Sequence, residues 1–336
     1  MLSVRNVNLA FGGPVLLHNA NLQINPGDRI CLMGRNGSGK STLLKLLAGE
    51  IEPDSGAIES SQSVTTGYLP QEVPSGLNET VFDVIALGLG KAGKALVRHR
   101  HLLDKHSSGN GPESNSETEK LSQFLEASGG WELQHKVEKA LSTLFLNSRD
   151  QFSALSAGLK RRVLLARSIA ATPDILLLDE PTNHMDIPSI QLMEEILLKS
   201  SRTLVFVSHD RAFTKKIATR IVELDRGELR DWKCGYSVFL ERRQALLSQE
   251  TQQRRKFDRK LEKEEVWIRQ GLKARRSRNE GRVRALEKLR ELRVSRRDRI
   301  GDVNFQVQDA GLSGKIVVKV RNAGYRYDER WCVRDF

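Results

Sequence analysis

Alternating apolar and polar residues mark the first part of the chain and predict β-strands there. Residues 2–25 alternate around a turn sequence at 12–14 (GGP), which predicts two short strands joined by a turn. Residues 29–33 form a short apolar run that predicts a third strand, and residues 41–48 have helical spacing and end at a glycine. The pattern therefore predicts a strand, a glycine-rich loop and a helix in succession.

A polar insertion changes this pattern at about residues 88–130. Residues 91–105 have the spacing of a basic helix. Residues 107–119 are polar with few apolar residues and predict a solvent-exposed tip, and residues 121–146 predict a second helix that returns to the core. We interpret the insertion as a helical subdomain.

Two later apolar runs, at residues 175–178 and 203–207, each follow a stretch with helical spacing. Such alternation is typical of a parallel sheet with helices on its faces. Residues 1–236 are therefore expected to form one α/β domain that carries the helical insertion. A chain of 336 residues has room for this domain and for a smaller second part.

The spacing from residue 237 to about 305 is almost purely helical, with a break between Gly271 and Gly281. Two helical runs with narrow apolar faces predict an antiparallel coiled-coil hairpin. Residues 241–300 contain 21 Lys and Arg against 10 Asp and Glu, whereas the rest of the chain has 33 against 32. Charge concentrated in one segment is typical of an element that binds a polyanion. A solvated helical spacer is the alternative interpretation.

The pattern of the N-terminus returns near the end of the chain. Residues 319–323 (KVRNA) resemble residues 3–7 (SVRNV), which predicts that residues 315–336 begin a second copy of the first domain. No apolar run approaches the roughly 18 residues of a membrane-spanning helix, and the N-terminus lacks a signal-peptide pattern. We therefore expect a cytoplasmic chain that contains no membrane domain.

A phosphate-binding motif lies between the third predicted strand and its helix. Residues 34–41 (GRNGSGKS) fit the pattern G-x-x-x-x-G-K-[ST], whose backbone N–H groups turn toward phosphates. Lys40 can reach the β- and γ-phosphates, and the hydroxyl of Ser41 can bind Mg²⁺. The candidate nucleotide-binding residues are Gly34, Arg35, Asn36, Gly37, Ser38, Gly39, Lys40, Ser41 and Thr42.

Two carboxylates end the apolar run at residues 175–178. Asp179 is suited to hold Mg²⁺ through its water shell, and Glu180 is positioned to polarise an attacking water. Two acids that merely end a strand are the alternative, but Lys40 and Ser41 in the same chain favour the catalytic interpretation. The sequence thus predicts a nucleoside triphosphate and Mg²⁺ as the ligands.

Five segments, GRNGSGKST, YLPQE, LSAGLKRR, LLLDEPTNHMD and VSHD, occur in the order and spacing of ATP-binding cassette domains. Over about residues 1–236 the chain resembles that family, and the resemblance implies an ATP hydrolase. It implies that Gln71 senses Mg²⁺ and the attacking water, that His209 contacts the γ-phosphate, and that Phe11 stacks on adenine. A core position in a strand is the alternative for Phe11.

The signature segment departs from the usual LSGGQ and reads LSAGL at residues 155–159. Ser156 and Gly158 are retained, whereas Ala157 replaces a glycine and requires a negative φ or some strain. In the family this segment serves the ATP bound to the opposite cassette. The departure therefore concerns the ATP site that this segment would share with an opposite cassette. It leaves the domain's own MgATP site unaffected.

Two cassettes in one chain, a charged helical linker and the PTNHxD form resemble the ABC-F family, and residues 264–290 resemble the linker of its Uup-type branch. The resemblance implies binding to the ribosome and tRNA. Contacts with RNA phosphates would come from Lys273, Arg275, Arg276, Arg278 and Arg282.

Two other functions stay open: an ATPase that binds branched DNA, because Uup-type proteins are also linked to DNA structures, and an ATPase subunit of a transporter. ABC-F proteins enclose two ATP molecules between two cassettes. Three interpretations of the single cassette stay open: a fragment of a two-cassette protein, a truncated gene product, or a chain that pairs with another copy, as in a homodimer. We expect slow hydrolysis without that partner.

Overall fold

A computed structural model describes residues 1–13, 15–61, 64–74, 76–107, 114–200, 202–271, 280–294, 324–327 and 330–333. The chain divides into two compact units, residues 1–295 and residues 296–336. In the second unit, β10 (Tyr325–Tyr327) pairs antiparallel with β11 (Arg330–Val333).

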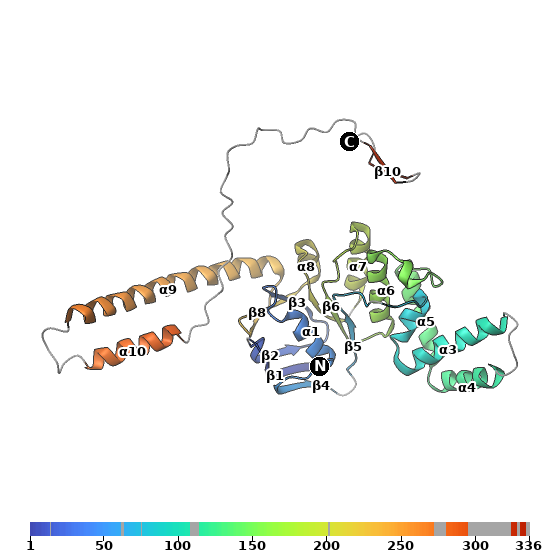
Figure 1. Ribbon diagram of the computed structural model, residues 1–336, viewed down its shortest axis with the longest axis horizontal. Coiled ribbons are helices and arrows are strands. Elements are labelled where there is room, and N and C mark those ends of the chain that lie inside the picture. The colour runs from blue at the N-terminus through green and yellow to red at the C-terminus, as the bar shows by residue number, and fades with distance from the viewer. Residues whose placement is uncertain are drawn as a thin grey trace. The chain divides into compact units, whose positions relative to one another are not determined.

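The first unit contains two sheets (Figure 1). A three-stranded antiparallel sheet has the order β2-β1-β4 and consists of β1 (Leu2–Leu9), β2 (Leu17–Ile24) and β4 (Ser55–Ser60). A six-stranded sheet has the order β5-β6-β7-β3-β8-β9 and is parallel except for β9. Its strands are β3 (Arg29–Gly34), β5 (Thr66–Leu69), β6 (Ile175–Asp179), β7 (Thr203–Val207), β8 (Arg220–Asp225) and β9 (Glu228–Trp232).

Helices cover both faces of the six-stranded sheet, which confirms the predicted α/β class. Strand β6 shows the two-sided burial: Leu176 and Leu178 belong to one apolar cluster, and Ile175 and Leu177 to another. Helix α1 (Lys40–Ala48) contributes its leucines to the cluster shared with the three-stranded sheet. The opposite cluster includes residues of α6 (Ala157–Ala170), α7 (Ile187–Lys199), α8 (Arg211–Ile217) and the 3₁₀ turn η1 (Phe152–Ala154).

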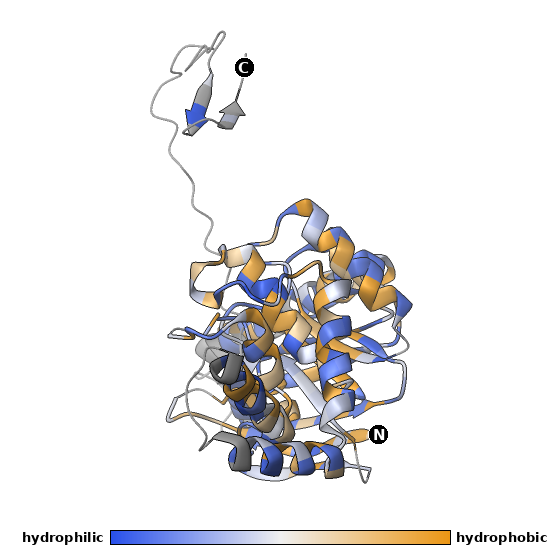
Figure 2. Cartoon of the chain, turned by 90° about the vertical axis from the view of Figure 1, so that its right-hand side faces the viewer, coloured by the Kyte–Doolittle hydropathy of each residue, from blue (hydrophilic) through white to orange (hydrophobic). Residues whose placement is uncertain are grey.

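The predicted helical subdomain is present and has more helices than its sequence pattern indicated. It contains α2 (Val81–Leu87), α3 (Gly90–Ser107), α4 (Ser114–Ala127) and α5 (Gly130–Thr143). Figure 2 shows apolar and polar residues alternating along helices, as expected where one helix face packs on a neighbour.

Two details of that prediction are wrong. The expected tip at residues 107–119 is helical from Ser114, where Glu and Lys favour a helix and Arg98 pairs with Glu117 at 3.0 Å. The expected single helix over residues 121–146 is broken at Gly129, whose φ of 67° lies in the left-handed region.

The predicted hairpin consists of α9 (Tyr236–Gly271) and α10 (Glu280–Val294), which contact each other. Leu261 and Leu286 are buried, and Arg290 of α10 pairs with Glu265 of α9 at 3.1 Å. None of the helices in the described ranges is both long enough and apolar enough to cross a membrane.

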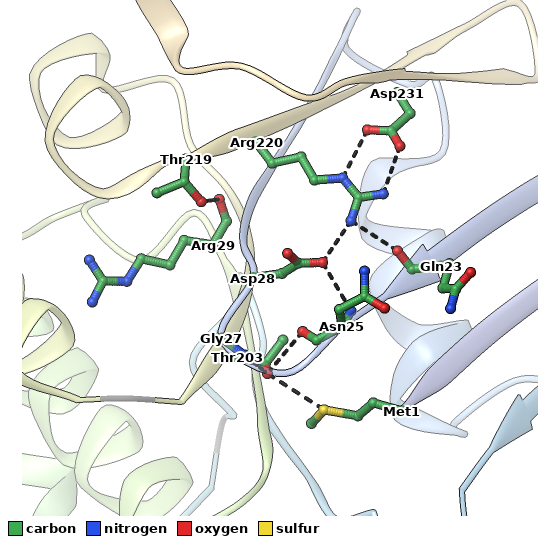
Figure 3. Close-up of polar contacts among 10 residues, drawn as sticks. All are labelled: Met1, Gln23, Asn25, Gly27, Asp28, Arg29, Thr203, Thr219, Arg220 and Asp231. Carbon is green, nitrogen blue, oxygen red and sulfur yellow. Dashed lines mark hydrogen bonds and ion pairs between the residues drawn. The ribbon is translucent and has the colours of Figure 1, made fainter.

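An ion-pair network around the buried Arg220 joins β8 and β9 to the turn that leads into β3 (Figure 3). The guanidinium of Arg220 donates to Asp231 at 2.8 and 2.7 Å and to Asp28 at 2.6 Å. It also donates to the backbone carbonyl of Gln23 at 3.0 Å. The hydrogen bonds with Asp231 raise the pKa of Arg220 above its usual value. Because Asp28 directly precedes β3, the network fixes the strand that carries the phosphate-binding loop.

We predict that Arg220→Met lowers the free energy of unfolding by about 2 kcal/mol, because it leaves two part-buried carboxylates without their partner. Urea unfolding would measure the change. The matched control is Arg5→Met, which removes an exposed pair with Glu59 at 3.2 Å and should cost less than about 1 kcal/mol. Equal losses for the two variants would contradict a special role for the Arg220 network.

Candidate nucleotide-binding site

The order of the sheet brings the predicted catalytic segments to one edge. Strands β5, β6, β7 and β3 are neighbours and run parallel, so their carboxyl ends meet at the same edge, where α/β sheets bind ligands. Gln71, the pair Asp179–Glu180, His209 and the loop that begins at Gly34 follow these strands in that spatial order.

The phosphate-binding loop has a backbone that side chains would disturb. A Cβ atom at Gly34 would lie 2.5 Å from the carbonyl oxygen of Leu224 and 2.7 Å from Oγ of Ser38, so only glycine fits there. Gly39 has a φ of 101° and directly precedes α1. The loop therefore delivers the N-terminus of α1, with its unpaired N–H groups and partial positive charge, to the edge of the sheet.

Lys40 is the first residue of α1 and is largely buried. Its Nζ donates to the carbonyl oxygens of Gly34 at 3.0 Å and Arg35 at 2.9 Å, so the ammonium group lies against the loop. Burial lowers the pKa of Lys40, and the nearby charges of Glu180 and Asp179 oppose that shift. The ammonium is thus a partly dehydrated cation beside the loop that the motif assigns to phosphates.

Asp179 is 1% exposed, and burial raises the pKa of its carboxyl group, while a hydrogen bond with Ser41 and the charges of Arg161 and Lys40 lower it. Within the described residues, Oδ1 of Asp179 and Oγ of Ser38 are buried and have no hydrogen-bond partner. Buried polar atoms without partners destabilise a protein unless a ligand or water completes them. A carboxylate and a hydroxyl beside a phosphate-binding loop suit Mg²⁺. These residues therefore fit MgATP.

Two nitrogen atoms of His209 hold the carboxylate of Glu180 in place. The carboxylate accepts a hydrogen bond from the backbone N–H of His209 at 3.1 Å, and Nε2 of His209 lies 3.2 Å from its other oxygen. The backbone of Glu180 has a φ of 47°, which is rare for residues other than glycine, and its N–H donates to the carbonyl of Val207 at 3.0 Å. Strained backbone of this kind concentrates at functional sites.

The signature residues begin α6. The side chain of Ser156 caps this helix by accepting a hydrogen bond from the N–H of Leu159 at 3.3 Å. Ala157 is helical, so its φ is negative and the missing glycine causes no strain there. A Cβ atom at Gly158 would lie 3.0 Å from the carbonyl oxygen of His184.

Phe11 lies between β1 and β2 and is 64% exposed, so the alternative of a core position is wrong. Leu16, a few residues further on, would be 3.4 Å from a Cβ atom at Gly39, which places this connection beside the phosphate-binding loop. The predicted nucleic-acid contacts Lys273, Arg275, Arg276 and Arg278 lie outside the described residues, and Arg282 belongs to α10 but its side chain also lies outside them.

Sequence reasoning gave no role to Arg161, a buried residue of α6. Its guanidinium donates to backbone carbonyls in the Gln71 segment and at Asp179 and Glu180. The one available signal was that residues one helical turn from Arg161, such as Leu164 and Leu165, are apolar.

Known families and proteins match the chain over most or all of its length. A family model described as ABC transporter matches residues 17–183, and a second with that description matches residues 222–305. The ATP-binding protein Uup of Haemophilus influenzae is 40% identical across 100% of this chain and 52% of its own length. The Escherichia coli protein of the same name is 40% identical across 100% of this chain and 53% of its own length.

The energy-dependent translational throttle protein EttA of Escherichia coli is 34% identical across 95% of this chain and 58% of its own length. The chain thus spans about half the length of the curated relatives it matches. An ABC transporter of metal-chelate type in an inward-facing conformation aligns with a TM-score of 0.50 and 26% identity, over 69% of this chain and 82% of its own.

An ATP-binding subunit of an ABC transporter aligns with a TM-score of 0.53 and 18% identity, over 69% of this chain and 89% of its own, and shows the fold alone. The motifs, the sheet order and the full-length similarity agree with one another. The chain belongs to the ATP-binding cassette family and is similar over its whole length to the Uup-type proteins of the ABC-F group.

Proposed function

We propose that the chain binds MgATP and hydrolyses it to ADP and phosphate. The observation that carries this proposal is the buried Glu180, held by His209 on one side and adjacent to Asp179 on the other. A carboxylate that is buried and oriented beside a phosphate-binding loop is suited to accept a proton from water. The names of the Uup relatives, which are ATP-binding proteins, support the same ligand.

Each residue has a distinct part in this proposal. Lys40 and the backbone of its loop bind the phosphates, and Asp179 and Ser41 hold Mg²⁺. Bound Mg²⁺ would neutralise charge that develops on the phosphates. Glu180 orients the attacking water and accepts its proton, and Gln71 and His209 would respond to the ion and the γ-phosphate.

A second cassette completes the proposal. The resemblance to two-cassette ABC-F proteins supports a second cassette that faces this one, and the curated relatives are about twice as long as this chain. Ser156 and Gly158, at the N-terminus of α6, would then contact the ATP bound to that partner. Hydrolysis by this chain alone would be slow and would increase with protein concentration if two copies associate.

We further propose that hydrolysis is coupled, in the cytosol, to binding of the ribosome and tRNA by the basic hairpin. Helix α9 starts inside the cassette core, where Tyr236 and Phe239 are buried. Arg243 of α9 pairs with Glu223, a buried residue of β8, at 2.6 Å. The hairpin is therefore anchored on a strand adjacent to β3, and the EttA relatives carry a translational function in their name.

Replacement of Glu180 tests the catalytic role. We expect Glu180→Gln to slow hydrolysis by about 100-fold or more, the usual effect of losing a general base, while MgATP binding is retained. Phosphate release and equilibrium binding would measure the two effects. The matched control is Glu194→Gln, which changes a buried carboxylate of α7 paired with Lys216 at 2.6 Å and should leave hydrolysis unchanged. Normal hydrolysis by Glu180→Gln would disprove the assignment.

Asp179→Asn is expected to raise the thermal midpoint of the nucleotide-free protein by a few degrees at pH 7 and to abolish Mg²⁺-dependent hydrolysis. Burial raises the pKa of Asp179 above 3.8, so the stability of the native protein falls as pH rises through that raised pKa, and the asparagine variant lacks this loss. Asp174→Asn is the control and should lower the thermal midpoint at pH 7. Hydrogen bonds from Thr65 lower the pKa of Asp174, so its ionised form stabilises the folded protein. A lower midpoint for Asp179→Asn in thermal scans without Mg²⁺ would contradict the assigned cause.

Sedimentation with purified ribosomes tests the proposed partner. We expect Glu180→Gln protein to pellet with ribosomes in MgATP, and glutamine at four tip positions to weaken the association about ten-fold or more at 0.15 M salt, because phosphate contacts dominate such binding. The tip set is Lys273, Arg275, Arg276 and Arg278, and the control set of exposed residues is Lys91, Lys94, Lys120 and Lys139.

Loss of pelleting in both the tip set and the control set would show nonspecific association and would count against the ribosome as the partner. Absence of pelleting by the Glu180→Gln protein itself would also count against it. A gel shift with branched DNA and with tRNA separates the remaining possibilities, because phosphate contacts alone carry little sequence information. Preference for branched DNA would replace the ribosome as the partner and leave the ATP site unchanged.

A further inference from the structure

Arg161 occupies an unusual position for a cation. It lies in the second turn of α6, and it is 2% exposed. A charged group is rarely buried to this degree unless hydrogen bonds satisfy it. Burial lowers the pKa of Arg161, and the charges of Asp179 and Glu180 oppose that shift.

The guanidinium joins two segments that are distant in the sequence. One terminal nitrogen, Nη1, donates to the carbonyl oxygens of Pro70 and of Gln71, the latter at 2.7 Å. The other, Nη2, donates to the carbonyl oxygens of Asp179 and of Glu180, the latter at 2.8 Å. A planar guanidinium presents paired donors in a fixed geometry, whereas a lysine ammonium offers a single compact charge.

These contacts lie where two neighbouring strands end. Leu69 of β5 pairs with Leu178 of β6. Arg161 binds the two residues that follow β5 and, at β6, its last residue and the one after it. Residues 70–74 form neither helix nor strand, so the Gln71 segment has no ladder to fix it there. Glu180 has its left-handed backbone at the same point, and such a conformation persists only when its surroundings hold it.

We propose that Arg161 is a positioning residue that sets the distance and orientation between the Gln71 segment and the carboxylate of Glu180. This proposal rests on the proposed ATP hydrolysis. Arg161 acts through backbone carbonyls, and within the described part of the chain none of its hydrogen bonds reaches the phosphate-binding loop, whose Lys40 and Ser41 would bind the nucleotide without it. Its loss should therefore reduce turnover and leave nucleotide affinity almost unchanged.

The neighbouring Arg162 provides a matched control. It belongs to the same helix, and its guanidinium donates to the carbonyl oxygen of Leu144 at 3.5 Å and to Oγ of Ser189. Arg161→Met and Arg162→Met remove the same charge from adjacent positions of α6. If Arg161 had a purely structural role, Arg161→Met would lower stability and turnover together, without a selective loss of kcat.

The test compares full-length Arg161→Met, Arg161→Lys and Arg162→Met at one protein concentration. We expect Arg161→Met to lower kcat for ATP about 10- to 100-fold, the cost of a small misplacement of catalytic groups, with KM and MgATP affinity changed less than about three-fold. Arg161→Lys should recover only part of kcat, and Arg162→Met should retain it. An equal loss in Arg162→Met, or a loss of affinity parallel to kcat, would overturn the proposal.

Hydrogen exchange provides a readout that does not depend on turnover. In nucleotide-free protein, Arg161→Met should increase amide exchange at residues 71–73, which lie between two prolines, relative to residues 43–48 of α1, and Arg162→Met should not. If the parent chain binds or hydrolyses no ATP, the proposed function fails, whereas this exchange comparison still decides the positioning role. Unchanged exchange at residues 71–73 would overturn that role.

Discussion

Burial of two adjacent carboxylates is the constraint on which the site depends. Asp179 and Glu180 end a fully buried strand, where a charge without partners is strongly unfavourable. The surrounding polar groups reduce that cost: Lys40 contributes a nearby charge, and His209 hydrogen-bonds the carboxylate of Glu180. One oxygen of Asp179 stays without a partner, which is the atom best placed to gain from a bound cation.

The same edge of the sheet links this site to the hairpin. Gly34 of the phosphate-binding loop lies against the backbone of Leu224, and the adjacent residue Glu223 pairs with Arg243 at the start of α9. Strand β8 therefore contacts both the phosphate-binding loop and the first helix of the linker through neighbouring residues. The Arg220 network holds β8 in register with the turn before β3.

Much of this arrangement could be predicted from local patterns. Alternation predicted the first strands, the motif predicted the loop and α1, and two glycines marked the break in the hairpin. The prediction was wrong where local signals conflicted. Polar composition concealed the helix that begins at Ser114, and helical spacing continued across Gly129, where the backbone turns left-handed.

The sequence by itself determined which chemical groups the chain has and which local elements carry them, because hydrogen-bond patterns and apolar spacing depend on near neighbours. Only the tertiary structure decided how those groups meet. Arg161 contacts carbonyls that precede it by 90 residues and follow it by 19, and nothing local specifies such a contact. The order β5-β6-β7-β3 brings these residues together, because parallel strands align their carboxyl ends only after distant segments have paired.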